Sequence, residues 1–374
     1  MNLRSQKWFT KSLKWTIKLK KICFVIESMQ GGGAQKNLYY LINTLRKNKN
    51  KIYLLTFSNK TKDIFIFSKD IQRSFLPLEQ NSISFLKKIS NNLKRLKSLR
   101  KFFNEKDFDI VISFLTTTNI LTIISTLGLR SKVIISERND PKRQEINFFW
   151  RILRNFFYKY CDLLTFNSKN SRDYFLKICP NHKVKYIPNF VYVMHKKPLK
   201  RKRKFMLAVG RLHIQKGFDI LIKAFSIFFK NNKNYDLIIL GAGDERKNLE
   251  KKIKELKLEN NIFLPGYLNP YPYYNACSLY ISSSRYEGVS NATLEAMQYK
   301  VPIIITDTQI GMFDYLKDNH SALFASTTPE SLAEKIKIII DSKKIKKKIS
   351  LNAYNSINKV DNKKIEEMWV KEIY

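Results

Sequence analysis

"LYISSSRYEGVSNATLEAMQYKVPIIITD", residues 279–307, contains one complete strand–helix–strand unit. The opening apolar run has the length of a strand, and Pro302 introduces a second run that is rich in isoleucine. Between these runs, Ser290 is a favourable N-cap for a helix that begins with "NATLEAM". Strands joined by a helix pair in parallel within one sheet. This stretch therefore predicts an α/β fold.

Similar apolar runs occur along the chain, each followed by a turn and a longer amphipathic stretch. They are "KICFVIE", "KIYLLTF", "DIVISFL", "KVIIS", "LLTFNS", "FMLAVG", "DLIILG", "NIFLPG", "LYISSS" and "VPIIITD". The basic, proline-containing run "IPNFVYVMHKKPLKRKRK" separates the first five from the last five. We expect two α/β domains, at 21–195 and 196–355. A basic extension (1–20) precedes them, and a C-terminal helix (356–374) is expected to cross back to the first domain.

The composition is that of a globular protein with a strongly basic surface. The chain has 374 residues, of which 44% are hydrophobic, and a net charge of +38. Such a field attracts phosphorylated small molecules, anionic lipid surfaces and nucleic acids. The four cysteines are far apart, which argues against a zinc site or a disulfide framework and favours a reducing cytosol. Lysines interrupt the N-terminal apolar residues, so no secretory signal peptide is expected.

One uncharged run, "IVISFLTTTNILTIISTLGL" at 110–129, is long enough to cross a membrane. Its centre, however, is polar: "TTTN" occupies the positions where a membrane span would be most apolar. Threonine and asparagine are typical of turns and helix N-caps. We expect a buried strand, a turn and a helix here.

Two carboxylates of the opening stretch, Glu287 and Glu295, flank the predicted start of its helix. The free N–H groups and the positive dipole end at a helix start attract anions, and Gly288 lets the backbone approach a ligand closely. Carboxylates on either side accept hydrogen bonds from sugar hydroxyls. A nucleotide sugar has this layout: ribose, diphosphate, sugar. The alternative is a capped helix with two solvated acids.

A second strand–loop–helix stretch, "AVGRLHIQKGFDILIKAF" at 208–225, adds two cations. Its strand ends at Gly210, and the following loop carries Arg211 and Lys216. Arginine offers two parallel donors and lysine a compact charge, a suitable pair for a diphosphate. The sequence thus predicts a phosphate site in the second domain.

The motifs, taken in order, resemble those of glycosyltransferase family 4. "VGRLHIQKGFDILIKAF", "LGAGDERKNLE", "NIFLPGY" and "SSSRYEGVSNATLEAMQYKVPIIITD" match its donor-binding half, and "GGGAQ", "IISERNDP", "LLTFNSKNS" and "IPNF" match its first half. The resemblance covers about residues 21–355. It implies the GT-B fold, in which two Rossmann-like parallel-sheet domains face a central cleft. It also implies an acceptor-binding first domain, a nucleotide-sugar-binding second domain and retaining transfer.

The resemblance also implies roles for individual residues. Arg211 and Lys216 would hold the donor diphosphate, Glu295 the ribose hydroxyls and Glu287 the hydroxyls of the transferred sugar. The glycine turn at 31–33 would face the donor phosphates across the cleft. The expected donor-binding residues are Gly32, Gly33, Gly210, Arg211, Lys216, Gly241, Gly243, Glu287, Gly288, Val289, Ser290, Asn291 and Glu295.

The chain departs from the family where many relatives carry a histidine after the fourth strand. Here the segment reads "SERND", 136–140, and none of the four histidines falls within it. Glu137 or Arg138 is a candidate replacement; the alternative is a Glu137–Arg138 ion pair at the cleft edge. The candidate catalytic residues are therefore Glu287, Arg211, Lys216, Arg138 and Glu137.

No metal and no cofactor are expected. Fixed cations and helix N–H groups can stabilise the departing nucleoside diphosphate without a metal. Asp107-Phe108-Asp109 has the D-x-D spacing of a metal site, but it directly precedes the apolar run "IVISF". We therefore interpret these acids as the start of a strand.

Two basic segments predict contact with an anionic membrane surface. The stretch "SFLKKISNNLKRLKSLRKFF", 84–103, has an apolar stripe at helical spacing and lysines and arginines elsewhere, and the N-terminal extension mixes tryptophan and phenylalanine with lysines. For 84–103, the alternative is a core-packed helix with a solvated basic face.

The sequence thus predicts a metal-independent retaining hexosyltransferase. The expected donor is a nucleotide sugar, UDP-linked and carrying galactose or N-acetylgalactosamine. The expected acceptor is a lipid-linked saccharide of a bacterial surface polysaccharide, such as capsule or O-antigen, at the inner face of the plasma membrane. A GT-B-type sugar-nucleotide epimerase is the first alternative. A nucleic-acid-binding protein is the second, although no recognised nucleic-acid motif is present.

Overall fold

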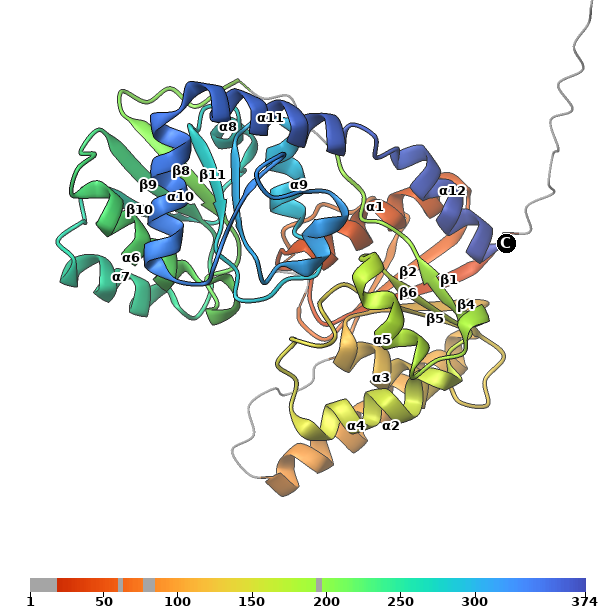
Figure 1. Ribbon diagram of the computed structural model, residues 1–374. Coiled ribbons are helices and arrows are strands. Elements are labelled where there is room, and N and C mark those ends of the chain that lie inside the picture. Colours follow the sequence, from red (N-terminus) through yellow and green to blue (C-terminus); the bar gives the residue numbers. More distant parts are fainter. Residues whose placement is uncertain (1–18, 60–62, 77–84, 193–196) are drawn as a thin grey trace, which may run out of the picture.

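The computed structural model shows two α/β units, each built on a parallel sheet (Figure 1). Within the described residues, the strand order is β3-β2-β1-β4-β5-β6-β7 in the first sheet and β10-β9-β8-β11-β12-β13 in the second. The predicted α/β fold with two parallel-sheet domains is confirmed. The structure describes residues 19–59, 63–76, 85–192 and 197–374.

The first sheet has helices on both of its faces. Its strands are β1 (Lys21–Ile26), β2 (Lys51–Thr56), β3 (Gln72–Phe75), β4 (Ile110–Phe114), β5 (Lys132–Glu137), β6 (Leu163–Phe166) and β7 (Val184–Tyr186). Its helices are α1 (Gly33–Lys47), α2 (Phe85–Lys106), α3 (Thr116–Thr126), α4 (Phe148–Phe157) and α5 (Arg172–Leu176), with 3-10 turns η2 (Tyr158–Tyr160), η3 (Lys169–Ser171) and η4 (Asn181–Lys183).

The second sheet repeats this architecture. Its strands are β8 (Lys204–Val209), β9 (Tyr235–Leu240), β10 (Ile262–Gly266), β11 (Leu279–Ser282), β12 (Ile303–Thr306) and β13 (Leu323–Ala325). Its helices are α6 (Phe218–Phe229), α7 (Arg246–Glu255), α8 (Tyr271–Tyr274), α9 (Asn291–Gln298), α10 (Pro329–Asp341) and α11 (Lys343–Ile357), with 3-10 turns η5 (Ile214–Lys216) and η6 (Ile310–Asp314). Residues 279–307 form β11, α9 and β12, and β11 pairs with β12 in parallel.

The uncharged run at 110–129 forms the predicted strand and helix, β4 and α3, but "TTTN" lies in the first turn of α3 and is neither the turn nor the N-cap. Leu115 joins them with a φ of 76°, and the run is buried over most of its length inside the first domain. Of the helices formed by the described residues, none has the length and apolar character needed to span a bilayer.

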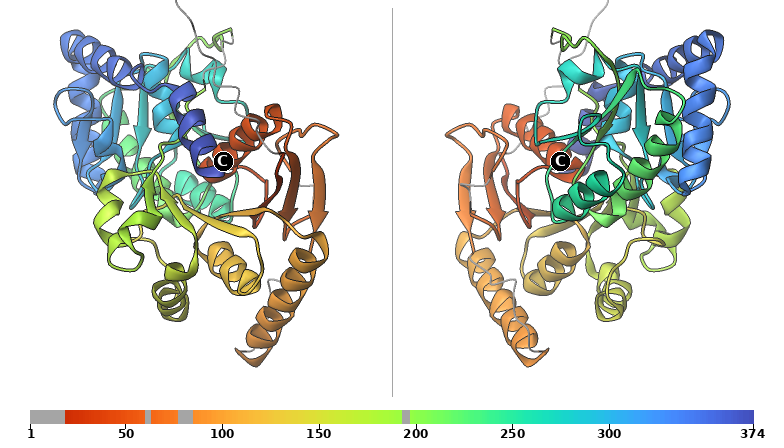
Figure 2. Two further views of the ribbon diagram at one scale, coloured as in Figure 1. Left: turned by 90° about the vertical axis from the view of Figure 1, so that its right-hand side faces the viewer. Right: turned by 90° about the vertical axis from the view of Figure 1, so that its left-hand side faces the viewer.

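Helix α12 (Asn362–Ile373) follows the second domain in sequence but packs on the first. Its inward residues Ile365, Trp369 and Ile373 are buried in the same cluster as the strands β1, β2 and β4. Figure 1 shows α11 and α12 running from one domain to the other, and Figure 2 shows α12 beside α1. The C-terminus thus returns to the first domain.

Helix α2 contains most of the predicted basic helix. Leu99 and Phe103 enter the core of the first domain, whereas Leu93 is 55% exposed. The C-terminal half of α2 is therefore core-packed with a solvated basic face, the alternative considered above. The aromatic residues of the N-terminal extension lie outside the described residues.

Candidate active site

Glu287 and Glu295 lie on either side of the start of helix α9. Glu287 belongs to the loop after β11, and Glu295 to the second turn of the helix. Ser290 caps α9, because its Oγ accepts a hydrogen bond from the Thr293 amide at 3.4 Å. The predicted N-cap is confirmed, and the loop delivers Glu287 next to the N-terminal end of the helix.

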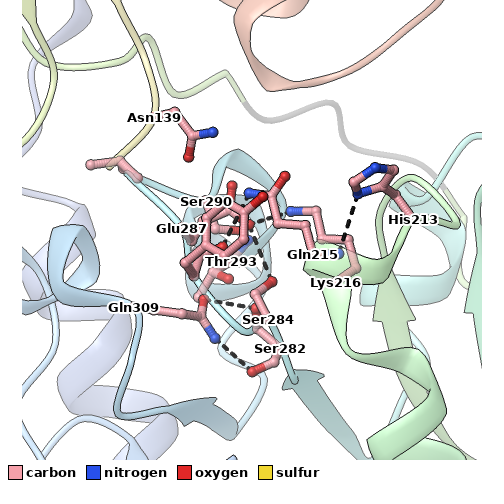
Figure 3. Close-up of polar contacts among 12 residues, drawn as sticks. Asn139, His213, Gln215, Lys216, Ser282, Ser284, Glu287, Ser290, Thr293 and Gln309 are labelled. Atoms are coloured by element: carbon pink, nitrogen blue, oxygen red, sulfur yellow. Dashed lines mark hydrogen bonds and ion pairs between the residues drawn. The ribbon is translucent and has the colours of Figure 1, made fainter. Parts of the chain in front are cut away.

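Lys216 and Glu287 meet in an ion pair (Figure 3). Lys216 ends the turn η5 after strand β8, and its ammonium binds Oε2 of Glu287. Ser284 donates a second hydrogen bond to the same oxygen at 3.1 Å. Arg211 lies exposed in the loop between β8 and η5 and takes no part in these bonds. Lys216 and Glu287, which are 71 positions apart in the sequence, therefore form one polar centre at the N-terminal end of α9.

Glu295 binds a residue of the other domain. It is 6% exposed, and its Oε1 forms an ion pair with the ammonium of Lys36 on α1. The same ammonium donates a hydrogen bond to the Tyr271 hydroxyl at 2.8 Å. Burial lowers the pKa of Lys36, but the Glu295 carboxylate and neighbouring groups raise it more strongly, so the net shift is upward. Lys36 is thus a firmly charged partner for the carboxylate assigned to ribose.

The predicted glycine turn before α1 contacts the start of α9. Gly31 and Gly32 adopt φ values of 110° and 131°, which favour glycine. The Gly33 carbonyl accepts a hydrogen bond from Nδ2 of Asn291 at 2.8 Å. Nδ2 of Asn189 donates in turn to Oδ1 of Asn291 at 2.7 Å. These amide contacts hold the glycine turn of one domain against the candidate anion site of the other.

Glycines of the second domain allow neighbouring loops to come close. A Cβ atom on Gly241 would lie 1.8 Å from the carbonyl oxygen of Gly210, and one on Gly243 would lie 2.3 Å from that of Leu212. A Cβ on Gly288 would lie 2.9 Å from the carbonyl oxygen of Arg138. These glycines position the loops around the site through the absence of a side chain.

The side chain of Glu137 lies inside the first domain. It is 1% exposed, and its Oε1 accepts hydrogen bonds from the Tyr158 hydroxyl and, at 3.5 Å, from Nδ2 of Asn119. Its other oxygen is buried without a hydrogen-bond partner among the described residues. Burial raises the pKa of Glu137.

The guanidinium of Arg138 binds Asn189, a residue of the motif "IPNF". It donates to Oδ1 of Asn189 at 3.0 Å and lies 5.6 Å from the ring of Trp369. Within the described part of the chain, no ion pair joins Glu137 to Arg138, so that alternative is wrong. Through Asn189 and Asn291, Arg138 is connected to the start of α9. A catalytic role for either Glu137 or Arg138 stays a prediction.

The interpretation of Asp109 as an acid at a strand start agrees with its contact in the structure. Asp109 accepts a hydrogen bond from the Lys21 amide at 2.7 Å, which joins the starts of β4 and β1 as expected for an acid at a strand start. His213 accepts a hydrogen bond from the Gln215 amide at 3.2 Å and stabilises the turn η5 (Figure 3). His195 lies outside the described residues.

Sequence reasoning missed three polar residues of this site: Lys36, Asn189 and Ser284. Lys36 follows the recognised turn "GGGAQ" directly, and Asn189 lies within the recognised motif "IPNF". These motifs indicated which segments belong to the site, but not which of their side chains form contacts in it. The roles of Lys36 and Asn189 depend on contacts between the two domains, which no local pattern specifies, whereas Ser284 contacts Glu287 within the same loop.

Comparisons with known proteins give consistent results for the two halves. Residues 31–193 match the family model described as Glycosyltransferase Family 4, and residues 193–356 match that of Glycosyl transferases group 1. One relative, from Campylobacter jejuni, is the "GalNAc-alpha-(1->4)-GalNAc-alpha-(1->3)-diNAcBac-PP-undecaprenol alpha-1,4-N-acetyl-D-galactosaminyltransferase". It is 28% identical over 94% of this chain and 98% of its own length.

A second Campylobacter jejuni relative is "N-acetylgalactosamine-N,N'-diacetylbacillosaminyl-diphospho-undecaprenol 4-alpha-N-acetylgalactosaminyltransferase". It is 27% identical over 93% of this chain and 97% of its own length. Among solved structures, sucrose-phosphate synthase from Thermosynechococcus elongatus superposes with a TM-score of 0.79 at 14% identity, covering 95% of this chain and 98% of that one. Anabaena HepE in complex with UDP-glucose gives 0.76 at 17% identity, covering 95% and 99%. At these identities the structures show a shared fold.

Proposed function

Because this chain belongs to glycosyltransferase family 4 and has the GT-B fold, we propose that it is a retaining hexosyltransferase with a UDP-linked donor. The transferred sugar is N-acetylgalactosamine or galactose. The acceptor is a lipid-linked saccharide of a bacterial surface polysaccharide. The enzyme works on the cytoplasmic face of the plasma membrane as a peripheral protein.

The observation that carries this proposal is the Lys216–Glu287 ion pair at the N-terminal end of α9, with Glu295 one helical turn further on. A diphosphate bound at this end of the helix has Lys216 as its counter-ion and the N–H groups of α9 as donors. The transferred sugar then lies toward Glu287 and the ribose toward Glu295, where each carboxylate accepts hydrogen bonds from hydroxyls.

The same groups account for the chemistry. When the bond between the sugar and UDP breaks, negative charge develops on the leaving diphosphate. Lys216, Arg211 and the helix N–H groups supply the positive charge and the donors that stabilise this charge. In a retaining transfer without an enzyme nucleophile, the acceptor hydroxyl attacks from the face that UDP leaves, and its proton passes to the departing phosphate.

Two relatives support the choice of donor and acceptor. The names of both Campylobacter jejuni enzymes describe transfer of N-acetylgalactosamine to saccharides on diphospho-undecaprenol. The net charge of +38 favours approach to an anionic membrane, where such acceptors reside.

The test is transfer of label from a panel of UDP-sugars by the purified protein. Labelled UDP-N-acetylgalactosamine, UDP-galactose, UDP-N-acetylglucosamine and UDP-glucose are each incubated with bacterial membrane lipid extract, with and without a chelator. We expect label from one of the first two in the lipid fraction, in an α-linkage by NMR, with no effect of the chelator. A β-linkage contradicts retention. Conversion of the donor without an acceptor identifies an epimerase instead.

A further inference from the structure

Helix α4 and the adjoining turn η2 expose a row of large apolar side chains. At about 100° of rotation per residue, the helical members of this row fall within an arc of about 100°. We call this row the aromatic face; its members are Phe148 (67% exposed), Phe149 (55%), Ile152 (49%), Phe156 (52%) and Tyr160 (47%).

The opposite face of α4 is apolar as well. Trp150, Leu153 and Phe157 pack against the core of the first domain. Trp150 also touches the cluster formed by α2 and its neighbouring strands, which fixes α4 in place. The remaining side carries two arginines and an asparagine, so the aromatic face is an exposed apolar stripe bordered by polar residues, a pattern that marks interaction or membrane sites. The aromatic face, which no described segment covers, is therefore suited to an apolar partner.

Cations border the aromatic face. The guanidinium of Arg151 lies 5.5 Å from the ring centre of Phe148, and the ammonium of Lys159 lies 4.8 Å from that of Phe156. Exposed rings interleaved with lysine and arginine are typical of the boundary between lipid headgroups and acyl chains. Helix α2 packs on the other side of α3 and carries exposed Lys94 and Lys97; Figure 1 shows α2 and α4 at the same end of the domain.

The charge distribution distinguishes between possible partners. A second copy of the chain would bring another protein with a net charge of +38 against this cationic border, which is unfavourable. An anionic bilayer offers phosphates to the cations and acyl chains to the rings.

The aromatic face is also connected to the candidate active site. The backbone of Arg138 and Asn139 lies against Gly288, and Arg143 donates to the Thr308 carbonyl of the second domain at 2.8 Å. The chain runs from this segment directly into α4. A membrane bound at α4 is thus joined by a short segment to the loop that carries Glu287.

We propose that the aromatic face of α4 inserts into the headgroup region of an anionic bilayer. The purpose of this face rests on the proposed function, in which the acceptor is a lipid-linked saccharide in the membrane. It differs from the basic helix at 84–103, because its contribution is apolar. Salt screens attraction between charges at the surface but leaves burial of aromatic rings in lipid intact.

The test is flotation of the full-length protein with vesicles of phosphatidylglycerol and phosphatidylcholine, at low and high salt. We expect the wild type to bind and to keep part of its binding at high salt. The double variant Phe148→Ser/Phe156→Ser should lose about tenfold in vesicle partitioning, because two exposed rings no longer enter the lipid. The matched control is Ile227→Ser/Leu351→Ser, which removes exposed apolar residues of the second domain and should bind like the wild type.

A second measurement does not depend on a loss of binding. A Phe156→Trp substitution adds a fluorophore on the aromatic face to the four native tryptophans, and brominated lipids should quench more fluorescence in this variant than in the wild type on vesicle binding. Unchanged partitioning of the double variant, or no more quenching in Phe156→Trp than in the wild type, overturns the proposal. So does concentration-dependent dimerisation or binding of single-stranded oligonucleotides through this face without vesicle binding.

Vesicle binding and sugar transfer are measured separately, so the two proposals can fail independently. If the proposed function is wrong, no transfer occurs with any acceptor, but flotation still reports on the aromatic face. If only the membrane surface is wrong, the double variant transfers sugar to membrane acceptors at the wild-type rate. If both are right, the variant keeps its rate with a detergent-solubilised acceptor and loses it with acceptor in vesicles.

Discussion

At the level of single residues, the Lys36–Glu295 ion pair joins the two domains at the carboxylate assigned to ribose. Substitution of Lys36 by methionine keeps the apolar stem but leaves a buried carboxylate without its counter-ion. We expect the KM for the donor to rise about tenfold, the equivalent of one charge-assisted hydrogen bond, with a smaller change in kcat. Lys36→Arg is the control and should stay close to the wild type. An unchanged KM in Lys36→Met would show that this cation has no part in donor binding.

Lys216 is expected to act on the leaving diphosphate. Lys216→Ala should lower kcat by about 10²- to 10³-fold, because a fixed charge near the developing negative charge is lost. The fold should persist, since Lys216 lies in the short turn η5 and is not part of the hydrophobic core of the second domain. Initial rates at saturating donor measure the effect, and Lys223→Ala, an exposed lysine on α6, is the control. Near-normal turnover in folded Lys216→Ala protein would remove the phosphate assignment.

The buried carboxyl of Glu137 should make the free energy of unfolding depend on pH. Burial raises the pKa of its carboxyl, so the folded protein holds a proton that the unfolded chain releases. Its stabilising contribution is complete below the ordinary pKa of 4.5 and is lost as pH rises through the folded-state pKa.

Glu137→Gln carries no charge at any pH. The free energy of unfolding of this variant, relative to wild type, should therefore increase from about pH 5 to pH 8, by at most about 1.4 kcal/mol per pH unit. Denaturant titrations at several pH values measure this difference. The exposed Glu255→Gln should show no such trend. A constant difference between Glu137→Gln and wild type would contradict the assignment.

Some of these residues could be predicted from the sequence and others could not. Glu287, Glu295 and Lys216 stand in ordered motifs at the ends of predicted strands, which locates them at one edge of a sheet. Lys36 is 259 positions from Glu295, and only the packing of the two domains brings them together. The sequence identified Arg138 as a candidate catalytic residue. It could not predict the neighbours of Arg138, because Asn189 and Trp369 come from distant parts of the chain.

At the level of elements, all ten predicted strands exist, and β3, β7 and β13 are additional. These three lie at sheet edges and have three or four residues each. Short edge strands need no continuous apolar run, because one side is open to solvent. For helix α4, the sequence did not indicate how much of the helix is exposed. Its apolar pattern predicts burial, and only the tertiary structure reveals that one face stays exposed.

Alanine substitutions of two glycines, each at the end of one of two neighbouring strands, distinguish the cost of backbone strain from the cost of a steric contact. Gly241 and Gly266 both have positive φ, 152° and 89°, but a Cβ would meet the Gly210 carbonyl only at Gly241. We expect Gly241→Ala to reduce the free energy of unfolding by about 2 kcal/mol or more beyond the cost of Gly266→Ala. Chemical denaturation of both variants measures the difference. Equal costs would mean that the close approach of the β8 and β9 loops is not required.

At the level of the whole molecule, the two domains are joined by side chains and by α12. The order of the domains could be inferred from the succession of strands and helices. Their relative placement could not, because it depends on contacts such as that of Lys169, whose amide donates to Asp314 at 2.8 Å. The candidate active site exists only in the assembled pair, since Glu295 takes its counter-ion from the first domain.

Trp369 on α12 tests how the C-terminal helix supports this assembly. Its ring is 1% exposed, lies in the core of the first domain and stacks near the Arg138 guanidinium. Trp369→Ala should lower the free energy of unfolding by about 3–5 kcal/mol, measured by denaturant titration. The donor KM should also rise, because Arg138 is linked through Asn189 to Asn291 at the start of α9.

The partly exposed Met368 on the same helix provides the control for Trp369, and Met368→Ala should change neither quantity appreciably. Trp369→Phe separates the two effects, because it restores most of the buried volume and an aromatic face for the guanidinium. It should recover the donor KM as well as part of the stability. If Trp369→Ala is strongly destabilised but binds the donor with unchanged KM, α12 holds the first domain together without influencing the site. If both change and Trp369→Phe restores both, the C-terminal helix is a structural part of the donor site.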